Sequence, residues 1–272
     1  MIVLENPRSP RVRAVAKLTK RSARTETGLF LLEGPQSVRE ALTYRPEAIV
    51  ELFATPGGWE RHPDIRAKAA DADVRVEYVT EDVLHAMADT VTPQGLVSVV
   101  RQTPTSVRDI FDAAPRLVAI CEEVRDPGNL GTIIRAADAA GADAVVLTGR
   151  TVDPYNPKVV RATTGSLFHL PVSVGGELPD VIDRAHAAGL RILAADVKGD
   201  DLLAARAEGV LAEPTAWLFG NEARGLEDDA LELADRVLRL PIFGRAESLN
   251  LATAASVCLY ESAFAQRAAP AG

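Results

Sequence analysis

Three short polar stretches follow apolar, strand-like runs in the second half of the chain, and each holds residues that can bind or orient a ligand. The last stretch is "LPIFGRAESLNLATAASVCLYE", residues 240–261, in which Ser248 and Asn250 come just before a helical pattern. Ser and Asn are favoured helix N-caps, because their side chains accept hydrogen bonds from the first free backbone N–H groups. Capping and ligand binding are therefore both open interpretations of this turn.

The first polar stretch is "EEVRDPGNLGTIIRAADAAGA", residues 122–142. Pro127 and Gly128 predict a turn, and Asn129 can cap the helix that follows. Arg135 lies early in that helix, away from the predicted core face. A cation there opposes the helix dipole, so helix stability does not explain it. We expect Arg135 to serve a ligand, with a solvated surface arginine as the alternative.

The second polar stretch is "TAWLFGNEARGL", residues 215–226. A buried strand is expected to end at Phe219, and Gly220 permits a sharp turn or a close backbone approach. Asn221 and Glu222 then stand at the carboxyl end of the strand, where open parallel sheets bind their ligands. A loop cap or a local salt bridge is the alternative explanation for these residues.

Several common catalytic signatures are absent from the sequence. There is no G-x-G-x-x-G after a first strand, no Walker A sequence, no Cys/His metal spacing and no G-x-S-x-G elbow. The usual sequence evidence for a dinucleotide-binding oxidoreductase, a kinase, a metalloenzyme or a serine hydrolase is therefore missing, and no metal is expected.

Alternating strand and helix patterns in the second half predict the scaffold that positions these stretches. Such alternation with apolar strands favours a parallel sheet covered by helices on both faces. The predicted strands are 116–124, 144–149, 167–174, 190–196, 215–221 and 236–242, and the predicted helices are 129–141, 178–189 and one from Asn250.

The first hundred residues predict a smaller α/β unit of about four strands, at 28–34, 47–55, 74–80 and 95–102. Residues 103–115 carry Pro near both ends and are the predicted linker. We therefore expect a domain at 1–102, a linker at 103–115 and a second domain at 116–272.

Charge is distributed unevenly over the 272 residues, whose net charge is −8. Residues 1–24 carry +6 and the remainder carries −14, so a basic arm is attached to an acidic body. Such an arm is either a phosphate-binding element or a solvated helix face. Its basic residues are Arg8, Arg11, Arg13, Lys17, Lys20, Arg21 and Arg24.

Hydrophobic residues make up 47% of the chain, but none of its apolar runs is long enough to cross a bilayer. The first 28 residues lack the apolar stretch of a secretory signal. Cys121 and Cys258 lie in apolar segments and are expected to be buried thiols rather than a disulfide. These features predict a cytoplasmic protein without a membrane partner.

The three polar stretches together resemble the motifs of the SpoU/TrmH ribose methyltransferases of the SPOUT superfamily. The matching patterns are N-x-G-x-x-x-R, L-F-G-x-E-x-x-G-L and L-P-I-x-G-x-x-x-S-L-N-L-A-x-A, in the family's order over residues 116–267. More loosely, "FLLEGPQSVREAL" and "TPQGLVSVV" resemble the N-terminal substrate-binding domain of the ribosomal RNA members.

The resemblance implies a parallel α/β fold whose C-terminal part forms a trefoil knot, which is very rare among proteins. It also implies that S-adenosylmethionine binds among the loops of the knot, largely through backbone groups. The residues that the resemblance assigns to the cofactor are Ala195, Phe219, Gly220, Asn221, Ile242, Ser248, Leu249 and Asn250.

The implied reaction is methyl transfer to a ribose 2′-hydroxyl of RNA. By resemblance Arg135 activates that hydroxyl, although an arginine pKa above about 12 makes a literal base role difficult. Binding an adjacent phosphate or stabilising a developing alkoxide is physically easier. The other polar motif positions, expected to orient Arg135, the ribose and the loops, are Asn129, Glu222, Ser248 and Asn250.

The resemblance further implies a homodimer with helix 250–267 as a candidate interface, and 23S ribosomal RNA as the substrate. A transfer-RNA methyltransferase is the first alternative, although those members typically lack a full N-terminal domain. A non-catalytic RNA-binding assembly factor is the second, and intact motif positions argue against it. A nucleotide-binding oxidoreductase is the third, and the missing glycine fingerprint argues against it.

We predict that RNA affinity falls steeply as salt concentration rises, because a basic arm that contacts phosphates releases counterions. Fluorescence anisotropy with labelled RNA at low and high salt measures this dependence. Equal affinity at both concentrations would contradict the proposed role of the arm.

Overall fold

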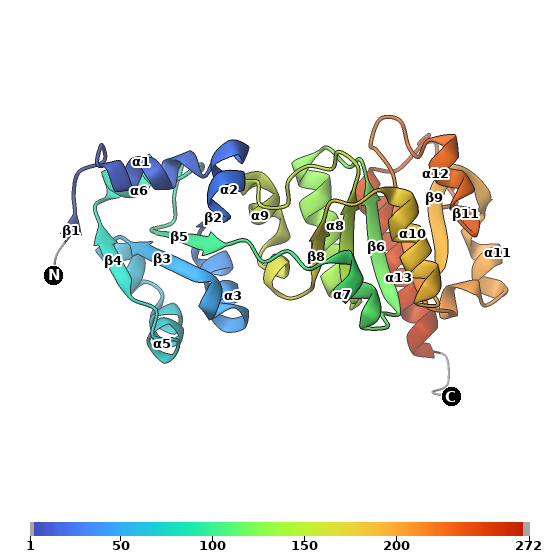
Figure 1. Cartoon of the computed structure of the whole chain (residues 1–272), viewed down its shortest axis with the longest axis horizontal. Helices are drawn as coiled ribbons and strands as arrows, with labels where there is room; N and C mark the ends of the chain where they lie inside the picture. Colours follow the sequence, from blue (N-terminus) through green and yellow to red (C-terminus); the bar gives the residue numbers. More distant parts are fainter. Residues whose placement is uncertain (1–2, 269–272) are drawn as a thin grey trace. The chain divides into compact units, whose positions relative to one another are not determined.

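The computed structural model describes residues 3–268, and the contacts of the chain divide it into two compact units. Unit 1 comprises Met1–Thr103 and Asp153–His169, and unit 2 comprises Pro104–Val152 and Leu170–Gly272. Each unit has its own sheet (Figure 1). Residues 153–169, which lie inside the range predicted for the second domain, thus make their contacts with the first unit.

Unit 1 is built on a mixed five-stranded sheet in the order β1-β4-β3-β5-β2. The strands are β1 (Val3–Leu4), β2 (Leu29–Glu33), β3 (Ile49–Ala54), β4 (Val76–Val79) and β5 (Leu96–Arg101). The four predicted strands are all present. The fifth strand, β1, has two residues and is too short to give a periodic signal.

The helices of unit 1 are short, and five of the seven α-helices have Pro in their first turn. The basic arm forms two helices. They are separated at Leu18–Lys20, and the second ends at Gly28 in the left-handed region. The α-helices are α1 (Pro10–Lys17), α2 (Arg21–Thr27), α3 (Pro35–Tyr44), α4 (Pro56–Glu60), α5 (Pro63–Asp71), α6 (Glu81–Met87) and α9 (Pro157–Thr163); 3₁₀ turns cover Pro46–Ala48 and Ser166–Phe168.

Residues 153–169 pack onto the rest of unit 1 through polar and aromatic contacts. Asp153 accepts from the guanidinium of Arg24 at 2.7 and 2.8 Å. The ring of Tyr155 lies 5.0 Å from that of Phe30, centroid to centroid. The predicted strand at 167–174 is only partly correct, since the strand begins at Val172 and residues 167–169 belong to this excursion.

Unit 2 contains a six-stranded sheet in the order β11-β9-β10-β6-β7-β8, and every neighbouring pair is parallel. The predicted parallel sheet is confirmed. The strands are β6 (Leu117–Glu122), β7 (Ala144–Thr148), β8 (Val172–Val174), β9 (Arg191–Asp201), β10 (Thr215–Phe219) and β11 (Arg236–Arg239).

Helices cover both faces of this sheet, as expected for buried parallel strands (Figure 1). One face carries α8 (Pro127–Ala140) and α13 (Leu251–Ala268), which pack against each other. The other carries α10 (Leu178–Ala187) and α7 (Val107–Asp112). Because α7 buries Ile110 and Phe111 in this core, the predicted linker contains an integral helix of unit 2. The remaining helices are α11 (Leu202–Ala207), α12 (Asp228–Glu232) and a 3₁₀ turn at Val210–Ala212.

The core beneath α13 contains a buried polar contact. Trp217 of β10 is fully buried, and its indole N–H donates to the hydroxyl of Ser262 at 2.9 Å. Cys121 and Cys258 are free and buried, as predicted. Over residues 3–268, the helices include none that is long and apolar enough to cross a membrane.

We predict that Ser262→Ala destabilises the protein by about 1–3 kcal/mol, because it leaves the buried indole N–H without an acceptor. Ser256→Ala on the same helix is the matched control, since that hydroxyl donates only to the carbonyl of Ala252. Urea unfolding measures both variants. Equal stability of the two variants would contradict a stabilising role of the hydrogen bond from Trp217 to Ser262.

Candidate functional site

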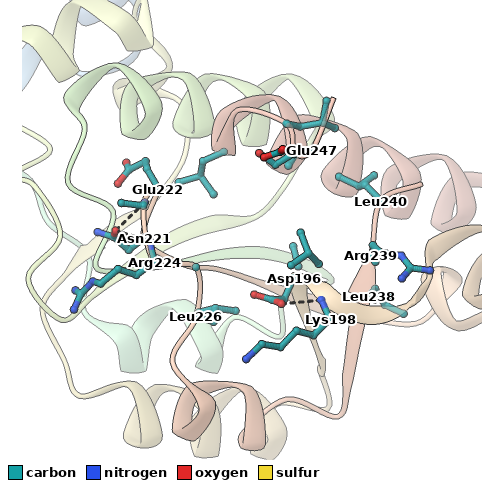
Figure 2. A pocket seen from close by; sticks show the side chains of 18 of the residues that line it. Asp196, Lys198, Asn221, Glu222, Arg224, Leu226, Leu238, Arg239, Leu240 and Glu247 are labelled. Carbon is teal, nitrogen blue, oxygen red and sulfur yellow. Dashed lines mark hydrogen bonds between the residues drawn. The ribbon is translucent and has the colours of Figure 1, made fainter. Parts of the chain in front are cut away.

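A cavity of unit 2 with a volume of about 630 Å³ lies at the carboxyl ends of β10 and β11 and beside the middle of β9. Three segments far apart in sequence surround it, as Figure 2 shows. Its lining residues are Ala195–Lys198, Asn221–Leu226, Leu238–Leu240, Ile242, Glu247–Leu249, Leu251 and Ala254. The edge of the sheet therefore joins two of the three polar stretches around one space, as expected.

A tight turn after β10 forms one wall of the cavity. The backbones of Asn221 and Gly225 exchange two hydrogen bonds, at 3.0 and 2.9 Å. A Cβ at Gly220 would lie 2.5 Å from the carbonyl oxygen of Gly225, so only glycine allows this approach. Gly225 itself has φ +70°, in the left-handed region.

The polar residues of the three stretches form one hydrogen-bonded network. Glu222 accepts from the backbone N–H groups of Arg125 at 3.2 Å and Asp126 at 3.0 Å. The side-chain amide of Asn129 donates to the same carboxylate at 3.4 Å and accepts from the amide of Asn250 at 2.9 Å. The carboxylate thereby connects the turn after β10 to the loop before α8, and Asn129 connects both to the start of α13.

The start of α8 differs from the prediction, because Asp126 and not Asn129 is the N-cap. The Asp126 carboxylate accepts from the backbone N–H of Asn129 at 2.8 Å, and Pro127 occupies the first helical position. This leaves the Asn129 side chain available for Glu222 and Asn250. At α13 the prediction is correct for Asn250, whose side-chain oxygen accepts from the N–H of Ala252 at 2.9 Å.

Arg135 lies on the exposed side of α8, two turns beyond its first residues. Among the described residues its guanidinium has no ion pair. An exposed cation without a counter-ion is free to bind an anion.

Five of the eight residues assigned to the cofactor line the cavity, namely Ala195, Asn221, Ile242, Ser248 and Leu249. The other three support it. Phe219 is fully buried at the end of β10, Gly220 makes the close backbone contact, and Asn250 caps α13.

Asp196 and Lys198 also line the cavity. The sequence prediction did not name them, although it expected the segment after strand 190–195 as a fourth, weaker cofactor loop. In the structure β9 continues to Asp201, where β11 pairs with it after a shift in register. The segment Val197–Asp201 lacks the apolar run that identified the rest of the strand, so hydropathy gave no signal.

Six of the seven predicted arm residues are exposed, and Arg24 is the exception at 2% exposure. Its guanidinium binds Asp153 and the carbonyls of Leu18 and Thr19, so it is not available to a phosphate. Arg11 is exposed but binds Glu51 and Glu77, both at 2.6 Å. The exposed cations of the arm that have no ion pair with any residue in the range 3–268 are Arg8, Arg13, Lys17, Lys20 and Arg21.

A second hollow of about 560 Å³ lies beside the cavity and shares the Asn221–Leu226 turn with it. Glu122 and Glu123 contribute from the end of β6. Burial raises the pKa of the Glu122 carboxyl above its ordinary value.

No cluster of potential metal ligands occurs within residues 3–268.

Sequence models of two protein families match the chain. The SpoU rRNA Methylase family matches residues 116–260, and the MRM3-like substrate binding domain matches residues 9–98.

Individual relatives align over nearly the whole chain. The 23S rRNA (guanosine(2553)-2′-O)-methyltransferase RlmP of Bacillus subtilis is 35% identical, covering 94% of this chain and 97% of its own. The 23S rRNA (uridine(2479)-2′-O)-methyltransferase of Streptomyces viridochromogenes is 33% identical, covering 91% and 86%. The crystal structure of an AdoMet-bound rRNA methyltransferase from Sinorhizobium meliloti superposes with a TM-score of 0.80 at 33% identity, covering 96% and 97%.

We predict that Glu222→Ala weakens binding of S-adenosylhomocysteine by about tenfold or more. Two backbone N–H groups lose their acceptor, and the turn beside the cavity is no longer hydrogen-bonded to the start of α8. Glu222→Gln retains one acceptor oxygen and should lose less. Glu232→Ala, an exposed change on α12, is the matched control. Isothermal titration measures all three variants, and an unchanged affinity for Glu222→Ala would refute the role of the network.

Proposed function

Because the chain belongs to the SpoU rRNA Methylase family, we propose that it transfers a methyl group from S-adenosylmethionine to a ribose 2′-hydroxyl of 23S ribosomal RNA. The observation that carries this proposal is the network of Glu222, Asn129 and Asn250 beside the cavity. All three motifs contribute to it, and Arg135 lies exposed on the same helix as Asn129.

The cavity fits S-adenosylmethionine in size and chemistry. Its volume is within the range of about 300–1,000 Å³ for small-molecule sites. Leu238, Leu240 and Ile242 offer apolar contacts for an adenine, and the Asn221–Leu226 turn offers backbone groups. The absence of a Cβ at Gly220 keeps that turn closed. When bound, the cofactor supplies an activated methyl group.

The chain then has to place the ribose hydroxyl in line and ease the loss of its proton. We assign this work to Arg135, whose guanidinium stabilises a developing alkoxide or binds the adjacent phosphate. Asn129, Glu222, Ser248 and Asn250 orient the loops around it. Arginine binds phosphate bidentately, which suits positioning of the nucleotide.

Unit 1 is proposed to bind the RNA, in keeping with its match to the MRM3-like substrate binding domain. The exposed, unpaired cations of α1, α2 and their flanks supply phosphate contacts that are independent of sequence. Arg24 is excluded because it is buried, and Arg11 is a weaker candidate because two carboxylates already bind it.

A homodimer, a trefoil knot and a cytoplasmic location complete the proposal. The outer side of α13 exposes Val257, Tyr260 and Phe264, the last at 55%, and such an apolar strip suits an interface. The ring centroids of Tyr260 and Phe264 lie 5.5 Å apart.

The loops 221–226 and 238–250, which the knot would contain, surround one cavity. A ribosomal RNA substrate supports a cytoplasmic location.

A transfer-RNA substrate remains the alternative that the same chemistry allows. The substrate-binding match in unit 1 and the 23S rRNA activity named for both relatives favour ribosomal RNA. A non-catalytic assembly factor is disfavoured, because Glu222, Asn129 and Asn250 of the three motifs are joined by hydrogen bonds. Arg135 also has no ion pair within the described part of the chain.

We predict that the purified protein, S-adenosylmethionine and unmodified ribosomal RNA yield a 2′-O-methyl nucleoside by mass spectrometry. Arg135→Ala should lower the rate about 100-fold or more, because it removes the cation beside the reacting oxygen. Arg184→Ala, an exposed arginine on the opposite face of the sheet, is the matched control. Methylation of transfer RNA instead would favour the alternative, and no methylation of any RNA would favour the assembly factor.

A further inference from the structure

Two arginines from different motifs converge on one carboxylate beside the cavity. Arg125, in the loop before α8, binds Oε2 of Glu123 at 3.0 Å, and Arg224, in the turn after β10, binds the same oxygen at 2.6 Å. Both guanidinium groups are about half exposed, and the Glu123 side chain is 26% exposed. Two cations around one oxygen form a site that can bind an anion, and in this structure the carboxylate of Glu123 occupies it.

The backbone of Glu123 is strained in a way that glycine would avoid. Its φ is +53°, in the left-handed region that few residues other than Gly and Asn adopt. The Asn221 side chain donates to its carbonyl at 2.9 Å and fixes this conformation. A Cβ at Gly149 would lie 2.6 Å from the carboxylate of Glu122 and 3.0 Å from Cγ of Glu123, so a glycine there makes room for both side chains. Strain of this kind persists where the surroundings hold it and often marks a functional site.

Cations and carboxylates both gather around this position in unit 2, since the adjoining hollow is also lined by Glu122, Glu177, Glu227 and Asp229. The loop Gly149–Val152 runs beside Glu123, joined by the bonds from Val124 to Thr151 and from Val152 to Val124. It presents Arg150, which is exposed and has no ion pair among the described residues. Glu227 also reaches Arg224, but at a longer distance of 3.4 Å.

We propose that Glu123 occupies the position of an RNA phosphodiester, and that Arg125 and Arg224 bind this phosphate once Glu123 is displaced. The inference rests on the proposed RNA methyltransferase function. Glu123 lowers the affinity for RNA by competing for both arginines, and it keeps them in place until substrate arrives. The phosphate would lie next to Glu222 and α8, close enough to position a neighbouring ribose at the cavity.

The anion is an RNA phosphate rather than the carboxylate of the cofactor. Of the three side chains only Arg224 lines the cofactor cavity, while Arg125 and Glu123 lie outside it. In Figure 2 the Arg224 side chain points away from Asp196 and Lys198, on the far side of that cavity. The shared carboxylate and Arg125 therefore lie outside the lining of the cofactor cavity.

The test compares Glu123→Gln, Arg125→Ala, Arg224→Ala, the double arginine variant and the triple variant with the unchanged protein. Binding of a labelled 23S ribosomal RNA fragment is measured over a salt series, without any methyl transfer. We expect Glu123→Gln to bind RNA about three- to tenfold more tightly, with a salt slope steeper by about one, because freed arginines make new phosphate contacts. Each Arg→Ala variant should bind more weakly with a shallower slope. The triple variant should bind RNA as the double variant Arg125→Ala/Arg224→Ala does, because Glu123 then has no arginine to compete for.

Three results would overturn the proposal. Weaker RNA binding by Glu123→Gln would show that the Glu123 carboxylate supports the structure of the site. Unchanged binding would show that Glu123 does not compete with RNA for the two arginines. A change in S-adenosylhomocysteine affinity without a change in RNA affinity would assign the arginines to the cofactor. Glu123→Gly, which relieves the backbone strain, separates carboxylate loss from folding effects and should bind RNA as Glu123→Gln does. Because binding is measured directly, failure of methyl transfer alone would count against the proposed function and not against this site.

Discussion

The carboxylate of Glu222 is the contact on which the arrangement of the site depends. It lies at the end of β10, yet its partners belong to the loop between β6 and α8. Adjacent parallel strands bring these two segments to one edge, but the sheet alone does not fix their loops. Two backbone N–H groups and the amide of Asn129 do so, and Asn250 extends the connection to the beginning of α13.

Backbone contact and side-chain hydrogen bonding restrain the cavity in different ways. Gly220 and Gly225 meet at a distance that excludes a Cβ, so the shape of the turn is set by sterics. The position of the turn relative to α8 is set by Glu222 instead. A site restrained in both ways loses little conformational entropy when a ligand binds, which favours affinity without a large contact area.

The sequence predicted those features that depend on local pattern or on motif. Strands such as β10 and β6 are continuous apolar runs, and their parallel pairing followed from the alternation with helices. Features decided by distant partners were not predictable. The burial of Arg24 depends on Asp153, which is 129 residues away, and the second half of β9 depends on β11. At α8 the sequence predicted Asn129 as the cap, whereas Asp126, three residues earlier, takes that position in the structure.

The excursion Asp153–His169 limits how far the chain can be treated as two separable modules. The polypeptide passes between the two units at residues 103–104, 152–153 and 169–170. A shortened chain beginning at residue 104 would retain Tyr155 and Phe168 but lose Phe30, against which both rings pack. It would also retain Asp153 without Arg24. Deletion or exchange of the first unit, in the laboratory or in evolution, therefore requires redesign of a segment that belongs by sequence to the second.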